Sequence, residues 1–68
     1  MFSERELITK IERLETCISL AMEVAYEWRQ DWSDFDGRTL LSQMEDLGRV
    51  AAGQLSGAEY REDWGLPR

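Results

Sequence analysis

The residues whose types and spacing could do chemistry lie between positions 27 and 37, in the stretch EWRQDWSDFDG. Its acids and glycine invite comparison with a calcium-binding EF-hand loop, which carries acids at positions 1, 3 and 5, glycine at 6 and glutamate at 12. With Gly37 at position 6, Asp34 and Asp36 occupy positions 3 and 5, but Trp32 and Gln43 stand at positions 1 and 12. Both end ligands are missing, so we expect no metal. Asp34 and Asp36 are better interpreted as acceptors for the free N–H groups of a helix start.

Catalytic chemistry has few candidates in this chain. The sequence contains no histidine and one cysteine, Cys17, so the commonest general base is missing and a nucleophile would have no histidine partner. Cys17 lies beside an apolar row, where cysteine is usually a small buried hydrophobe. The adjacent acids Glu45 and Asp46 would point about 100° apart on a helix and would not converge on one atom. We therefore expect neither an enzyme nor a cofactor.

A row of acids and a cluster of aromatics remain as candidates for binding. Glu23, Glu27 and Asp31 stand at i, i+4 and i+8. They would stack on one helix face, where their like charges repel. The row is either a solvated face or a stripe that meets a basic partner or imitates nucleic acid. The aromatics either continue the core or form an exposed hot spot for a protein partner. The candidate partner-binding residues are Trp28, Asp31, Trp32, Phe35, Glu27 and Glu23.

A long first helix is expected to position these residues. Ser3 and Glu6 have the spacing of a capping box, which predicts a helix start. Apolar residues then alternate in steps of four and three up to Trp32, predicting a helix over about 4–32 whose seam packs against another helix. Additional apolar side chains between residues 17 and 26 widen this seam.

A second helix is predicted over about 38–55, with a further line through Leu41, Gly48 and Ala52 beside its main apolar face. Gly48 and Gly53 indicate either close backbone packing or an early helix end near Gly53. A short helical turn is expected at about 58–63, before Gly65 and Pro67 stop it. The residues predicted to pack in the core or in a dimer are Leu7, Ile11, Leu14, Ile18, Ala21, Ala25, Leu40, Met44, Leu47, Ala51 and Leu55.

The expected fold is an all-α helical hairpin forming a single domain over residues 1–68. A chain of 68 residues buries little core, and with one cysteine and no histidine it lacks the disulfides or structural metal that often stabilise small domains. Two hairpins that pair into a four-helix homodimer are the simplest way to cover both apolar faces. The alternative is a monomeric three-helix fold in which residues 58–66 provide the cover.

Charge and composition exclude several function classes. The net charge of −6 argues against binding nucleic acid through its phosphates. We expect no secretory signal, no membrane span and a cytoplasmic location. The expected function is a non-catalytic inhibitor or adaptor, of the kind common in phages and mobile elements, that sterically occupies the surface of another protein. The alternatives are an acidic mimic of nucleic acid and a structural subunit of a larger helical complex.

Overall fold

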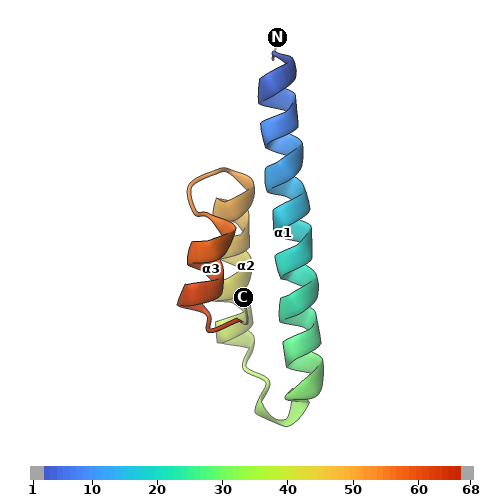
Figure 1. Cartoon of the computed structure of the whole chain (residues 1–68). Helices are drawn as coiled ribbons and strands as arrows, with labels where there is room; N and C mark the ends of the chain where they lie inside the picture. Colours follow the sequence, from blue (N-terminus) through green and yellow to red (C-terminus); the bar gives the residue numbers. More distant parts are fainter. Residues whose placement is uncertain (1–2, 67–68) are drawn as a thin grey trace.

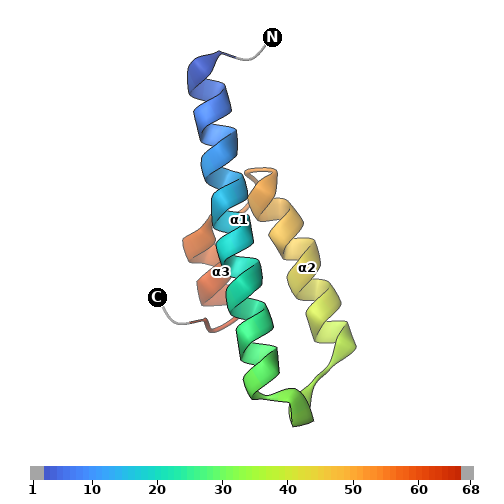
Figure 2. The ribbon, with the colours of Figure 1, turned by 90° about the vertical axis from the view of Figure 1, so that its right-hand side faces the viewer.

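The computed structural model describes residues 3–66, and all regular secondary structure within that range is helical. Helix α1 (Glu4–Gln30) is followed by the 3₁₀ helix η1 (Trp32–Asp34), helix α2 (Gly37–Ala51) and helix α3 (Gly57–Asp63). The first two α-helices form an antiparallel hairpin, and α3 folds back along one side of it (Figure 1). The N-terminal part of α1 projects beyond the other two helices (Figure 2). The predicted all-helical class and the order of long, medium and short helices are confirmed.

The two ends of α1 have local causes. At its start the Ser3 hydroxyl accepts a hydrogen bond from the backbone N–H of Glu6 at 3.2 Å, as a cap should. At its end Asp31 leaves helical geometry, with φ −109° and ψ 42°. The helix therefore ends at Gln30, two residues before the predicted end, because the chain enters the tighter turn of η1 at Trp32.

Helix α2 begins and ends through similar local contacts. The Asp36 carboxylate accepts from the backbone N–H of Arg38 at 3.0 Å and from the Thr39 hydroxyl at 2.9 Å. Gly53 has a positive φ of 80°, and the following N–H, of Gln54, bonds to the Arg49 carbonyl at 2.8 Å. This is a glycine-terminated helix end. The predicted end at 55 is wrong, and Gly53 marks the early end that the sequence left open.

Helix α3 coincides with the short turn predicted over 58–63. Ser56 caps it by accepting from the Glu59 N–H at 3.1 Å. A Cβ added to Gly57 would lie 2.8 Å from the Thr16 side chain, so the missing side chain permits α3 to approach α1 closely. Gly65 ends the segment with a φ of 65°. Pro67, the other predicted stop, lies outside the described residues.

The core forms where the three helices meet. Its buried side chains are Leu20, Val24, Leu47, Val50 and Tyr60. On α1 the core line therefore runs through Leu20 and Val24 rather than through the predicted seam, because α3 lies on that side of the hairpin.

The predicted packing residues divide into two groups. Within the single chain Leu47 is buried, and Leu40, Ala51 and Leu55 are half-buried. The remainder are exposed, namely Leu7, Ile11, Leu14, Ile18, Ala21, Ala25 and Met44. These residues do not build the core of one chain, and their packing in a dimer stays a prediction.

Candidate protein-binding surfaces

Three aromatic side chains at the bend between α1 and α2, Trp28, Trp32 and Phe35, form a surface that we call the aromatic tip. Phe35 stacks on Trp32 with ring centroids 5.0 Å apart and meets Trp28 edge-on at 5.3 Å. Such geometries are favourable beyond the area that they bury. Trp32 is nevertheless 69% exposed and Phe35 42% exposed, so the tip is an ordered apolar surface in contact with solvent.

The tip is tied to the core through Trp28. The indole N–H of Trp28 donates to the side-chain oxygen of Gln43 at 2.8 Å, and Gln43 is buried. The Tyr60 hydroxyl donates to the backbone carbonyl of Gln43 at 3.2 Å. This hydrogen bond and the edge-on contact with Phe35 favour one orientation of the Trp28 ring, and Phe35 in turn stacks on Trp32.

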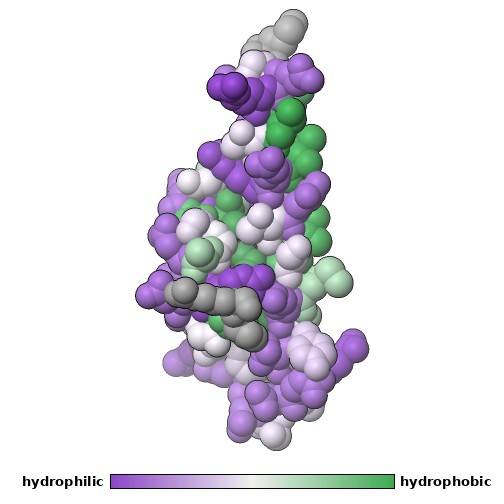
Figure 3. Space-filling view, viewed as in Figure 1, coloured by the Kyte–Doolittle hydropathy of each residue, from purple (hydrophilic) through white to green (hydrophobic). Residues whose placement is uncertain are grey.

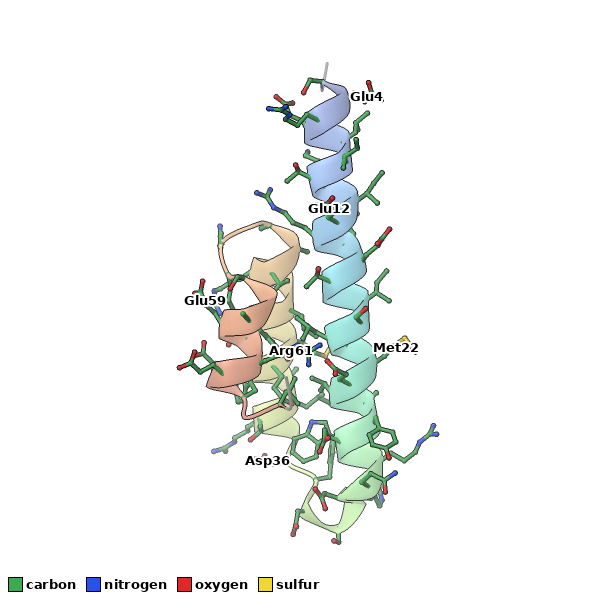
Figure 4. All side chains as sticks on the ribbon, in the orientation of Figure 1. Glu4, Glu12, Met22, Asp36, Glu59 and Arg61 are labelled. Atoms are coloured by element: carbon green, nitrogen blue, oxygen red, sulfur yellow. The ribbon has the colours of Figure 1, made fainter. Side chains whose placement is uncertain are left out.

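The acidic row is not continuous. Glu23 forms an ion pair with Arg61 of α3, and this carboxylate raises the pKa of the Arg61 guanidinium. Figure 4 shows Arg61 lying between α3 and α1. Glu27, Asp31 and Asp34 are exposed and line a shallow pocket of about 250 Å³ with Trp28, Gln43 and the C-terminal residues 64–66. The acids that remain available therefore lie beside the aromatic tip, whereas Glu23 is part of the fold.

A second surface covers the side of the hairpin opposite α3. We call it the open face, and its residues are Leu7, Ile11, Leu14, Ile18, Ala21, Met22 and Ala25 of α1 and Leu41, Met44 and Gly48 of α2, all exposed. Figure 3 shows hydrophobic side chains along the edge of α1 that faces away from α3. In Figure 4, Met22 points away from both other helices.

Helical geometry places the α1 part of this face. An α-helix advances about 100° per residue. On α1, Thr16 and Glu23 face α3. Turning about the helix axis in the direction of this 100° step, the next residues are Cys17 and Trp28, which contact α2. The predicted seam of α1, represented by Ile18, follows them and lies beyond α2 on the far side from α3.

The exposed line of α2 lies on that same far side. Asp46 accepts a hydrogen bond from Trp64, the residue directly after α3, and Leu47, whose carbonyl accepts from Cys17, is turned toward α1. Met44 and Leu41 continue around α2 in the same sense. Because α1 and α2 are antiparallel, both rotations finish on one side of the hairpin, the side that faces the viewer in Figure 2. The two exposed lines therefore form one apolar surface.

Gly48 belongs to this surface and has no packing reason within the chain. A Cβ at this position would meet no atom within 4 Å, although glycine inside a helix costs about 1 kcal/mol relative to alanine. Close packing within the chain, the other explanation the sequence left open, therefore does not apply to Gly48. The glycine leaves a flat place on the open face where another helix could approach.

Sequence reasoning missed the polar contacts that join the helices. Gln43 is three residues after Leu40 and four before Leu47, so its place on the apolar line of α2 was a usable signal. The indole of Trp64 donates to Asp46 at 3.1 Å, and neither residue carried a sequence signal for that contact.

The single cysteine lies in a structural position. The Cys17 thiol is half-buried and donates to the Leu47 carbonyl at 3.4 Å. Among residues 3–66, no three side chains of the metal-binding types are grouped. Over the same range, no helix combines the length and apolarity needed to cross a bilayer.

No family model, curated protein or solved structure matches this chain.

Proposed function

We propose that the protein is a non-catalytic homodimer that acts as a small inhibitor or adaptor, with the open face joining two copies and the aromatic tip contacting another protein. The observation that carries the proposal is the position of Trp32, which is 69% exposed and stacked on Phe35 outside the core. Exposed, preorganised tryptophan is the residue most typical of protein-binding hot spots. The fold does not need it there.

The mechanism is steric. The tip supplies apolar anchors whose orientation is fixed before binding, which lowers the entropy cost of association. Asp31 and Asp34, which are exposed beside it, supply charge that steers a basic partner surface and raises the association rate. A protein that binds in this way blocks or bridges its partner without chemistry.

The tip is tested with Trp32→Ala, compared with Tyr26→Ala as the matched control. Tyr26 is 61% exposed on α1 but does not belong to the tip. We expect a tagged wild-type protein and the Tyr26 variant to retain the same host protein, and the Trp32 variant to lose it while keeping its helical circular dichroism. Equal retention by both variants would refute the role of the tip.

Charge reversal separates this proposal from nucleic-acid mimicry. A mimic depends on its carboxylates, so its binding would fall steeply with salt and would survive Trp32→Ala. The pairing of Glu23 with Arg61 removes one acid from such a surface. Glu27→Lys combined with Asp31→Lys, at two exposed acids, is therefore expected to slow association and leave most of the affinity, whereas the same pair of reversals would abolish the binding of a mimic.

The homodimer is tested with Ile18→Glu and Ser19→Glu, neighbouring exposed positions on and off the open face. Light scattering at micromolar concentration is expected to give twice the chain mass of 8.0 kDa for the wild type and the Ser19 variant. The Ile18 variant is expected to be a helical monomer. If the wild type forms no defined dimer and is poorly soluble or partly unfolded when made alone, the open face instead belongs to a different chain, as in a structural subunit.

A further inference from the structure

We infer that the two copies pair with their α1 helices antiparallel, so that the N-terminal half of each α1 covers the C-terminal half of the other. A two-fold axis then passes near Ile18. The inference rests on the homodimer proposed above and adds its orientation and register.

The open face has the size that a second copy requires. Its larger side chains are each between 48% and 69% exposed, which amounts to on the order of 700 Å² per protomer, close to the ~800 Å² per partner of a stable interface. The largest apolar patch on an ordinary monomer is about 300–600 Å². The side chains counted are Leu7, Ile11, Leu14, Ile18, Met22, Leu41 and Met44.

Charge selects the orientation. Glu4 stands seven residues before Ile11 and Arg29 seven after Met22, so both continue the open face of α1 at opposite ends. Both are exposed, and neither forms an ion pair in the structure of residues 3–66. Antiparallel pairing brings Glu4 toward Arg29 of the other copy on both sides of the axis. Parallel pairing would place Glu4 against Glu4 and Arg29 against Arg29.

Side-chain size selects the same orientation. The N-terminal half of the seam carries large residues such as Ile11, and the C-terminal half carries Ala21 and Ala25. With the axis at Ile18, Ile11 lies opposite Ala25, each being seven residues from the axis. At this pair a large residue packs against a small one, which lets the two helices approach closely, while Leu14 lies opposite Met22 nearer the axis. Parallel pairing would set Ala25 against Ala25 and leave space between the helices.

The projecting start of α1 also packs against the body of the other copy only in this orientation. Every side chain of residues 4–12, which we call the overhang, is exposed apart from the half-buried Thr9. In the antiparallel pair the overhang of one copy lies beside Ala25 of the other, and its apolar side chains reach toward Leu41 and Met44 of α2. In a parallel pair each overhang would contact only the other overhang.

Electron paramagnetic resonance distances test the orientation directly. A nitroxide at Arg5→Cys, in a Cys17→Ser background shown by light scattering to keep the oligomeric state, labels an exposed position off the open face. Position 5 is 13 residues before Ile18, so antiparallel labels are separated by 26 residues of helix, roughly 40 Å at 1.5 Å per residue. A parallel dimer would give less than about 25 Å, since packed helices are about 10 Å apart.

Charge reversal supplies an independent test without labels. We expect Glu4→Arg and Arg29→Glu each to raise the dimer dissociation constant about tenfold, because two symmetric attractions become repulsions. The double variant restores both attractions and is expected to return to within about threefold of wild type. Glu12→Arg, an equal charge change at an exposed position off the open face, is the control and should change the constant little.

The outcomes separate the two proposals. A dimer with a short label distance, or with single reversals that behave like Glu12→Arg, overturns the antiparallel arrangement and leaves the homodimer standing. A chain that stays monomeric to millimolar concentration overturns both. A long distance together with rescue by the double variant supports both.

Discussion

At the residue scale, Gln43 joins all three helices. Its side-chain oxygen accepts from Trp28 of α1, and its backbone carbonyl accepts from Tyr60 of α3. A buried amide with satisfied partners specifies one arrangement of the helices, because leaving either partner unpaired is costly.

We expect Gln43→Ala to lower the free energy of unfolding by about 1–3 kcal/mol, since it leaves the Trp28 N–H without its acceptor and opens a small cavity. Urea unfolding followed by circular dichroism measures this change. Gln54→Ala is the control, because Gln54 is exposed, and it should stay within about 0.5 kcal/mol of wild type. Equal losses in the two variants would contradict the role given to Gln43.

Tyr60 gives the molecule a defined response to alkaline pH. Burial, followed by the nearby Asp46 and Cys17, raises the pKa of the Tyr60 hydroxyl from 10.0 to about 12. The folded state therefore keeps this proton where the unfolded state releases it. This difference contributes roughly 2–3 kcal/mol to the free energy of unfolding, fully present below pH 10 and lost as the pH rises toward 12. Unfolding free energies measured across this window test the expected decline.

Tyr60→Phe is the control for that decline. It should cost about 1 kcal/mol at neutral pH through the lost hydrogen bond, and it should remove the part of the alkaline slope that belongs to Tyr60. Tyr26→Phe should keep the full slope. If both variants declined alike between pH 10 and 12, another group would be responsible.

At the scale of elements, local chemistry decides where each helix begins, and the whole chain decides which face it buries. Ser3 and Asp36 cap their helices as their sequence positions indicate, and those starts were predictable. The buried face of α1 was not, because its heptad seam is more regular than the line through Leu20 and Val24. Only the side on which α3 returns, a matter of tertiary contact, makes the second line the core.

The approach of α3 to α1 is tested with Gly57→Ala. A Cβ there would lie 2.8 Å from the methyl carbon of Thr16, so we expect a loss of about 1–3 kcal/mol from overpacking. Thr16→Ser removes that methyl group and should recover most of the loss in the double variant. Thermal unfolding measures both. A double variant no more stable than Gly57→Ala would show that the cost has another origin.

At the scale of the whole molecule, the candidate sites were only partly predictable. The aromatic tip could be located from the sequence, because Trp28, Trp32 and Phe35 crowd a bend where little chain remains to cover them. The open face could not be located from the sequence. Its two halves come from different helices, and they join only because α1 and α2 pack antiparallel with α3 on the opposite side of the hairpin. An antiparallel dimer would carry its two tips at opposite ends, an arrangement that could bridge two partner molecules.

Gly48→Ala distinguishes the chain alone from the dimer. In the monomer, where the added Cβ would meet nothing within 4 Å, the change should stabilise α2 by up to about 1 kcal/mol. In the dimer the same Cβ would lie under the second copy, so the dissociation constant should rise. Unfolding at low concentration and sedimentation at high concentration measure the two effects. Ser42→Ala, exposed on α2 but off the open face, should leave dissociation unchanged.

The overhang of α1 would give this chain a way to register its own abundance. The overhang extends a helix that is already nucleated on the core, so in a single chain its residues are held by helix propensity with little tertiary support and fray from the N-terminal end. Below the dissociation constant, residues 4–12 would fray and become open to proteases, and above it they would be helical and shielded. The cellular lifetime of the protein would then lengthen as its concentration increases.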